Sequence, residues 1–203
     1  EMKTLVVDRS TDEQSLALVE GEAVVAETTL AGMDCRSGDW VLKVREFAGP
    51  GAPDRIVVGT VHSSFAGIRA ALAFPQGYAL GSGCEVLGLP SPCAYAPAEG
   101  PLAVVGDARR ERYWIALFDG PKLVVPVFQV AKDQLELRVP LGTKVVSPDE
   151  KRIGELLKET FADRFVAGAG APKAGGLARA FLANPKLLKP EPLPIYLNPA
   201  VRD

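Results

Sequence analysis

The stretch LVVDRST at residues 5–11 carries the pattern from which the fold of the whole chain is inferred. Three apolar residues end in an aspartate, and polar residues then stop the hydrophobic run, as in a buried strand followed by a turn. Residues 15–19 (SLALV) predict a second strand, and Gly21-Glu22 predicts a turn into a third strand at residues 23–28. The chain therefore opens with three strands that are linked by hairpins.

The same unit returns near the middle of the chain. Residues 102–107 (LAVVGD) again form an apolar run that ends in an aspartate, and further strands are predicted at residues 112–118 and 122–127, joined by an Asp119-Gly120 turn. A strand–Asp–turn–strand–turn–strand unit that occurs twice, each time followed by helices, indicates two related lobes. This is the organisation of the actin-like ATPase (ASKHA) fold, an α/β fold with two ribonuclease-H-like lobes whose mixed sheets are flanked by helices.

The remaining segments fit this two-lobe arrangement. Hydrophobic periodicity predicts helices at residues 40–47, 64–80, 148–161 and 176–183, and strands at residues 55–59, 85–89 and 164–168. The Pro-rich segment at residues 90–101 resembles a connector. We therefore expect an N-terminal lobe at residues 1–97, which carries the partner-binding helices, and a shorter C-terminal lobe at residues 98–203, whose tail can pack back on the first lobe.

Composition and charge narrow the class of protein. The chain has 203 residues, of which 47% are hydrophobic and 24% charged, and its net charge is −2. These values are typical of a globular protein and argue against a free-standing nucleic-acid binder. Asp8 ends the first apolar run too early for a signal peptide, and no run approaches the roughly 20 residues of a membrane helix, so we expect a cytoplasmic protein with no membrane contact.

The charge is also distributed unevenly along the chain. Residues 1–100 hold 7 basic and 13 acidic side chains, a net charge of −6, whereas residues 101–203 hold 16 and 12, a net charge of +4. The border coincides with the connector between the predicted lobes. The two halves are therefore expected to lie in different surroundings.

Cysteine and histidine are too scarce for several kinds of site. The three cysteines, Cys35, Cys84 and Cys93, contain no CxxC pair, and His62 is the only histidine. A disulfide framework and a structural zinc site are therefore excluded, and no metal site is expected. For His62 a surface or interface position is favoured, while a role as ligand or base stays open.

Several stretches resemble the TsaB family, also called YeaZ, which takes part in making threonylcarbamoyladenosine in tRNA. Residues 5–18 resemble the family's strand-Asp-Thr-Ser-Thr opening, and residues 57–69 (VVGTVHSSFAGIR) are similar to its Gly-x-Gly-Pro-Gly-Ser-Phe-Thr-Gly-x-Arg signature. Residues 107–114 (DARRERYW) resemble the family's Asp-Ala-Arg-x-Gly-Glu-x-Tyr motif, and residues 76–80 (QGYAL) and 192–197 (PLPIYL) resemble two shorter motifs. The matches occur in the family's order over nearly the whole chain.

The sequence departs from the family pattern at two places. Val61, His62 and Ser63 replace glycines and the proline of the signature loop. Residues 35–38 (CRSG) stand where family members carry an Arg-x-His-Ser/Thr segment. The chain is therefore similar to a divergent member, and the divergence falls on segments expected to touch a partner.

The resemblance implies a non-catalytic scaffold that binds TsaD, the subunit with the metal and the transfer chemistry. With the ATPase TsaE, the complex would transfer threonylcarbamoyl to adenosine 37 of tRNA, which this chain would contact only indirectly. In TsaB relatives the helix pair that matches residues 40–47 and 64–80 forms both a homodimer and the TsaD contact. The expected interface residues are Trp40, Val44, Phe65, Ile68, Arg69 and Leu72. A place in the chain's own core is the open alternative for each of them.

The turn after the first strand of each lobe bears on catalysis. An actin-like ATPase holds phosphates on these turns, where glycines let backbone N–H groups approach. Here the turns are Asp8-Arg9-Ser10 and Asp107-Ala108-Arg109, in which the aspartates are present and the glycines missing. We therefore predict no catalytic residue and no tightly bound cofactor, and we expect the aspartates to cap their turns.

Weaker alternatives remain open at the same positions. Residual nucleotide or metal contacts would involve Asp8, Ser10, Gly59, Ser64 and Asp107, with the loop at residues 168–171 (GAGA) as a seat for adenosine. ATP or ADP at the interface of the complex is also open. Two other functions compete with the scaffold: an ATP-dependent phosphotransferase of the actin-like fold, and a homodimeric structural protein without a tRNA role.

Overall fold

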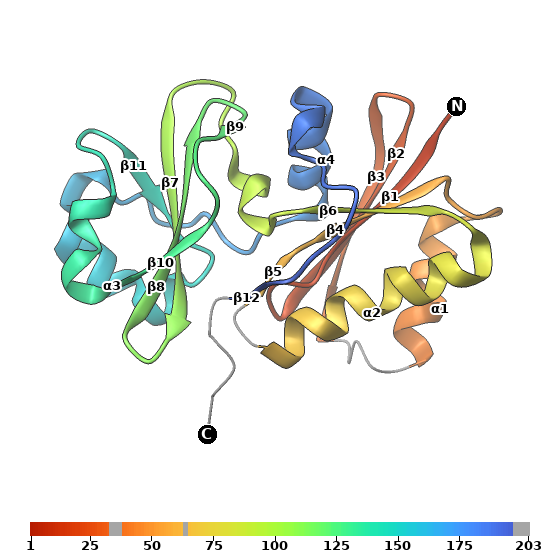
Figure 1. Cartoon of the computed structure of the whole chain (residues 1–203), viewed down its shortest axis with the longest axis horizontal. Coiled ribbons are helices and arrows are strands. Elements are labelled where there is room, and N and C mark those ends of the chain that lie inside the picture. Colours follow the sequence, from red (N-terminus) through yellow and green to blue (C-terminus); the bar gives the residue numbers. More distant parts are fainter. Residues whose placement is uncertain (33–37, 63–64, 197–203) are drawn as a thin grey trace.

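Two mixed β-sheets lie side by side, and helices cover their faces (Figure 1). The structure is a computed structural model that describes residues 1–32, 38–62 and 65–196. The first sheet has the order β3-β2-β1-β4-β6. Its strands are β1 (Lys3–Asp8), β2 (Glu13–Glu20), β3 (Ala23–Ala31), β4 (Arg55–Gly59) and β6 (Glu85–Leu89). The first three strands are antiparallel, as the opening hairpins predict, while β4 and β6 run parallel to β1.

The second sheet repeats this arrangement in a shorter form. Its order is β10-β8-β7-β11, with β9 also paired to β8. The strands are β7 (Pro101–Arg109), β8 (Arg112–Asp119), β9 (Lys122–Leu123), β10 (Phe128–Ala131) and β11 (Lys144–Val146). β8 is antiparallel to β7, and β11 is parallel to β7. The predicted repeat of a strand, a turn and an antiparallel strand is therefore confirmed.

The helices fall close to the predicted segments. The α-helices are α1 (Gly38–Ala48), α2 (Phe65–Ser82), α3 (Glu150–Phe161) and α4 (Ala174–Ala183). The 3-10 helices are η1 (Ser91–Tyr95), η2 (Lys132–Gln134), η3 (Glu136–Arg138), η4 (Ala162–Arg164) and η5 (Pro185–Leu187). Two short strands, β5 (Val61–His62) and β12 (Ile195–Tyr196), pair in parallel. Within the described residues, no helix is both long enough and apolar enough to cross a membrane.

Two predicted strands in the second lobe are shorter than expected. Residues 122–127 were predicted to form one strand, but only Lys122 and Leu123 do so. Pro126 has no N–H to donate to a ladder, and pairing resumes at β10. The strand predicted at residues 164–168 is reduced to a single bridge between Phe165 and Val145, and Gly168 has already left extended geometry with a φ of 83°.

The apolar strands are explained by burial on both faces. On β1, Leu5 and Val7 pack with Trp40 and Val44 of α1, whereas Val6 belongs to the cluster on the opposite face. Successive side chains of a strand point to opposite sides, so a strand covered on both sides needs a continuous apolar run. This accounts for the pattern that opens the chain.

One hydrophobic core connects the two sheets. The same cluster contains Val6 of the first sheet, Val104 and Ala116 of the second, and Leu177 and Phe181 of α4. A second cluster packs α3 against the far face of the second sheet. The two lobes are therefore joined through shared buried side chains as well as through the chain.

The segment after residue 173 returns to the first sheet. α4 contacts β1, β2, β3 and η1 (Figure 1). The N–H of Ala174 donates to Ser15 Oγ at 2.8 Å and satisfies one of the free donors at the start of the helix. Lys173 also pairs with Glu13 at 2.7 Å. The C-terminal part of the chain is thus held on the N-terminal lobe.

Candidate functional site

The first of the two turns singled out from the sequence is closed by Asp8. Its Oδ1 accepts hydrogen bonds from the Ser10 N–H at 3.0 Å and from the Ser10 hydroxyl at 2.6 Å. An aspartate that binds the backbone two residues later is a common way to stabilise a turn. The interpretation of Asp8 as a turn cap is confirmed.

The Asp8 carboxylate is enclosed by protein. Its exposed fraction is 0%, and burial raises its pKa against the opposing effect of the Ser10 hydrogen bonds. Gly59 at the end of β4 packs against it, and a Cβ there would overlap Asp8 Oδ2 and lie 2.5 Å from Ser91 Oγ. Gly59 is therefore required for close packing around this carboxylate.

The second turn is closed in the same way by Asp107. Its Oδ1 accepts a hydrogen bond from the N–H of Arg109 at 2.7 Å, which confirms the second turn cap. The next residues turn tightly, because Arg109, Arg110 and Glu111 have φ values of 68°, 54° and 57°. Non-glycine residues adopt this left-handed region uncommonly, so the missing glycine is replaced at a cost in backbone strain.

An ion-pair network that the sequence analysis did not identify joins this turn to α3. Arg152 Nε donates to Asp107 Oδ2 at 2.9 Å, and Arg152 Nη2 donates to Asp149 Oδ1. The Asp107 N–H donates to Asp149 Oδ2 at 2.8 Å. Burial raises the pKa of Asp149, while the Asp107 N–H and Arg152 oppose that rise. The sequence signal at residues 148–150 (PDE) indicated only the start of a helix.

The two turns and the glycine loop border a common cleft of about 750 Å³. Ser10 and Thr11 line it from the first turn, Arg109 from the second, and Gly168 and Gly170 from the loop before α4. Its charged residues have both signs: Asp12, Glu13, Asp149, Glu150 and Glu155, and Arg109, Lys151, Arg152 and Lys158. The structure thus brings together three of the segments named from the sequence, but it gives the cleft no dominant charge.

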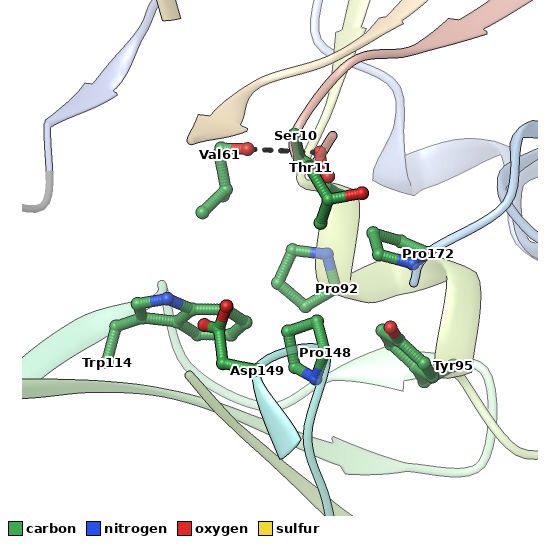
Figure 2. Close-up of a pocket in the computed structure, with 10 residues that line it drawn as sticks. Ser10, Thr11, Val61, Pro92, Tyr95, Trp114, Pro148, Asp149 and Pro172 are labelled. Carbon is green, nitrogen blue, oxygen red and sulfur yellow. Dashed lines mark hydrogen bonds between the residues drawn. The ribbon is translucent and has the colours of Figure 1, made fainter. Parts of the chain in front are cut away.

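The space beneath this cleft is filled by large side chains. Figure 2 shows Trp114, Pro92 and Pro148 converging from different segments. The pocket that they line has a volume of about 20 Å³. The Tyr95 hydroxyl donates to the Gly170 carbonyl at 2.6 Å and fixes the loop to η1. The cleft is therefore shallow, and Asp8 does not line it.

The residues around the signature loop are arranged as a strand. Gly59 ends β4, and Val61–His62 forms β5, which pairs with Ile195–Tyr196. The extended pairing differs from an open loop that wraps a phosphate. Ser64 and residues 35–37 lie outside the described residues, as do the side chains of His62, Phe65 and Ile68. The predicted roles of these residues stay predictions.

Three of the predicted interface side chains lie in the chain's own core. Trp40 and Val44 are fully buried, and Leu72 is nearly so. The Trp40 ring meets Phe74 of α2 edge-on at 4.7 Å and lies 4.5 Å from the Arg9 guanidinium. These three residues therefore pack in the chain's own core, which was the open alternative for them. Any contribution of theirs to an interface would be indirect, through the support of neighbouring exposed residues.

Other residues form the accessible surface of the helix pair. Leu42 of α1 is 62% exposed, and Val41 and the α2 residue Leu80 are also exposed. Arg69, the remaining predicted interface residue, is exposed and lines a hollow of about 510 Å³ between α2 and residues 192–194. The burial of Trp40, Val44 and Leu72 was not evident from the sequence, because both helices carry apolar residues on more than one side. An interface on this helix pair stays a prediction.

The two related mixed sheets, each with an antiparallel strand pair followed by parallel strands, define the actin-like ATPase fold. A protein of unknown function with this fold from Bacteroides thetaiotaomicron superposes with a TM-score of 0.50 at 9% identity, covering 89% of this chain and 95% of that one. The fold class predicted from the repeat is confirmed. No protein-family model matches the chain, and no curated protein matches its sequence.

A stronger similarity is to YeaZ. YeaZ from Pseudomonas aeruginosa has a TM-score of 0.73 at 18% identity, with 97% of this chain and 100% of that chain covered. An uncharacterized protein described as similar to peptidase YeaZ from Pseudomonas aeruginosa has a TM-score of 0.71 at 20% identity, with 98% and 100% covered. The resemblance in sequence motifs is thus accompanied by a resemblance in fold over the entire chain.

Proposed function

We propose that the chain is a non-catalytic scaffold of the TsaB type. It binds TsaD in the complex that, with TsaE, transfers threonylcarbamoyl to adenosine 37 of tRNA in the cytoplasm. The observation that carries this proposal is the superposition on YeaZ over the full length of both chains. The motifs at residues 5–18, 57–69 and 107–114 add support, because they occur in the family's order along the chain.

The burial of Asp8 supports the absence of catalysis. The carboxylate that ends β1 is sealed behind Gly59 and the β1–β2 turn. Phosphoryl transfer needs groups that touch the phosphates and their metal ion. Asp8 cannot do so without rearrangement of the turn, since its exposed fraction is 0%. In the described part of the chain, no three His, Cys, Asp or Glu side chains gather as a metal site.

The exposed side of α1 and α2 supports a protein partner. Trp40 of α1 packs edge-on against Phe74 of α2, so the two helices are in contact and their outer residues form the exposed surface of the helix pair. Leu42, Val41 and Leu80 leave apolar side chains on that surface without a covering segment among the described residues. Rigid helix faces with apolar residues at the centre are common in stable interfaces. The same surface would form the homodimer when TsaD is absent.

Co-purification with TsaD of the same organism tests the partner. The wild-type chain should form a stable complex, and Leu42→Asp should weaken it at least tenfold because it buries a charge in the contact. Val25→Asp is the matched control, since Val25 is 50% exposed on β3 and lies outside the helix pair. A wild-type chain that forms no complex, or equal losses from both variants, would contradict the proposal.

Reconstitution tests the role of the chain in tRNA modification. Transfer to adenosine 37 by TsaD and TsaE should stop when this chain is omitted and return when it is added back. Titration with Mg-ATP distinguishes the phosphotransferase alternative. Tight binding with turnover by the isolated chain would show that it is an enzyme itself.

A further inference from the structure

A second hollow between the lobes has a different lining from the cleft. Its volume is about 920 Å³, and it is formed by residues 122–127 of the second lobe, residues 184–195 on their return to the first sheet, and Thr60 and Pro90. Its lining residues do not overlap with those of the cleft at Ser10 and Asp149. We call it the lysine-rimmed groove.

The floor of the lysine-rimmed groove is apolar. Its hydrophobic residues are Pro90, Leu123, Val124, Val125, Pro126, Val127, Leu187, Leu193 and Ile195. Val124, Val125 and Leu193 are strongly exposed, which is costly for side chains of this kind. Because Pro126 prevents regular strand pairing, the valines on either side of it face the groove instead of continuing β9.

Three lysines belong to the same lining as these apolar residues. Lys122, Lys186 and Lys189 line the groove, together with a single carboxylate from Glu191. None of the three lysines forms an ion pair with any residue that the structure describes. The groove thus has a local charge of +2 in a chain whose net charge is −2. Like charges around one hollow repel each other, and a bound anion would relieve that repulsion.

We propose that the lysine-rimmed groove binds an anionic ligand with a hydrocarbon body, the chemistry of a medium-chain carboxylate. The volume falls within the range of about 300–1,000 Å³ that small-molecule sites occupy. Lysine stems can lie along the hydrocarbon while their ammonium groups meet the carboxylate.

The polar lining favours this ligand over an extended peptide. A peptide would bring many backbone N–H and C=O groups into the groove, and each needs a partner. Thr60 and Asn184 are the uncharged polar side chains in the lining, and Asn184 Nδ2 already donates to the Pro121 carbonyl at 3.2 Å. A hydrocarbon chain needs no such partners and removes apolar surface from water.

Calorimetry with monomeric dodecanoate tests the charge. The wild-type chain should bind dodecanoate at one saturable site and should bind dodecyltrimethylammonium at least tenfold more weakly. The triple variant Lys122→Ala/Lys186→Ala/Lys189→Ala should lose roughly tenfold in dodecanoate affinity, as expected for exposed ion pairs. Lys132→Ala, on an exposed lysine of the second lobe outside the groove, should leave the affinity unchanged.

A second pair of variants tests the location. Val125→Asp places a carboxylate on the groove floor and should abolish dodecanoate binding, whereas Val25→Asp on β3 should not. Circular dichroism and thermal melts establish that each variant is folded. The proposal would be overturned if the wild-type chain bound dodecanoate and dodecyltrimethylammonium equally or did not bind dodecanoate. Unchanged dodecanoate binding by Val125→Asp would also overturn it. Tighter binding of an acidic, apolar hexapeptide than of dodecanoate would overturn it in favour of a peptide site.

Discussion

Adjacent glycines at the start of α4 should respond in opposite ways to alanine. Gly175 and Gly176 both lie in the first turn of the helix, and neither has a positive φ. A Cβ on Gly176 would lie 2.6 Å from the backbone oxygen of Ala94 and 3.1 Å from its Cα. A Cβ on Gly175 would instead meet the carboxylate of Glu27, which is the far end of a flexible side chain.

The expected free energies follow from these neighbours. Ordinary contact begins near 3.4 Å, so α4 and η1 would have to separate by about 0.8 Å to admit Gly176→Ala. Overpacking of this kind costs about 1–3 kcal/mol. The higher helix propensity of alanine offsets about 0.5–1 kcal/mol of this cost, so the free energy of unfolding is expected to fall by about 1–2 kcal/mol.

Gly175→Ala should be neutral or slightly stabilising. Glu27 has to move from its position beside Arg179, with which it forms an ion pair at 2.6 Å. Both side chains are more than a third exposed, and such pairs contribute about 0–1 kcal/mol. The gain in helix propensity is of similar size and opposite sign.

Thermal unfolding followed by tryptophan fluorescence measures both variants against the wild type. For a chain of this length, 1 kcal/mol corresponds to a shift of roughly 2–4 °C in Tm. Gly176→Ala should therefore melt several degrees lower than Gly175→Ala. Equal stabilities, or the reverse order, would refute the inferred close packing of α4 against η1.

Three further variants address close packing in the sheet and helices and the buried carboxyl group of Asp8. Gly106→Ala would place a Cβ closer than 3.0 Å to three atoms of the buried Trp114 indole and should cost about 3 kcal/mol in urea unfolding; the exposed Gly77→Ala in α2, with no atom within 4 Å, should instead stabilise. Asp8→Asn keeps the acceptor for Ser10 but removes the buried titrating group. Since the folded state raises the pKa of Asp8 above 3.8, wild-type stability should fall as pH rises from about 4 toward neutral, relative to Asp8→Asn. Parallel urea curves for both proteins from pH 4 to pH 7.5 would contradict this assignment.

Local patterns predicted the parts of the fold that depend on neighbours in sequence. The apolar runs that end at Asp8 and Asp107 specify a strand and a turn, because an aspartate side chain reaches the backbone two residues later. The order of strands in each lobe follows from such hairpins and from the helices after them. Both turn caps and the repeated unit were therefore accessible from the sequence.

Contacts between segments far apart in the sequence could not be predicted from local patterns. Asp107 and Arg152 are 45 residues apart, and nothing in either motif indicates that the β7–β8 turn meets the start of α3. The sequence also could not determine which face of α1 is buried. Trp40 and Val44 lie on one face of the helix and Val41 and Leu42 on another, and all four residues are apolar. Only packing against β1 determines that Trp40 and Val44 face inward.

The hydrophobic core shared by the two lobes bears on how the protein works. Proteins that close around a ligand by domain motion need an interface that can open and reform. Here both sheets contribute to one buried cluster through α4. Opening the lobes would expose that cluster to water, at a cost that scales with the apolar area. A rigid body of this kind is better suited to presenting a fixed surface than to enclosing a substrate, which supports a function carried by the outer faces of α1 and α2.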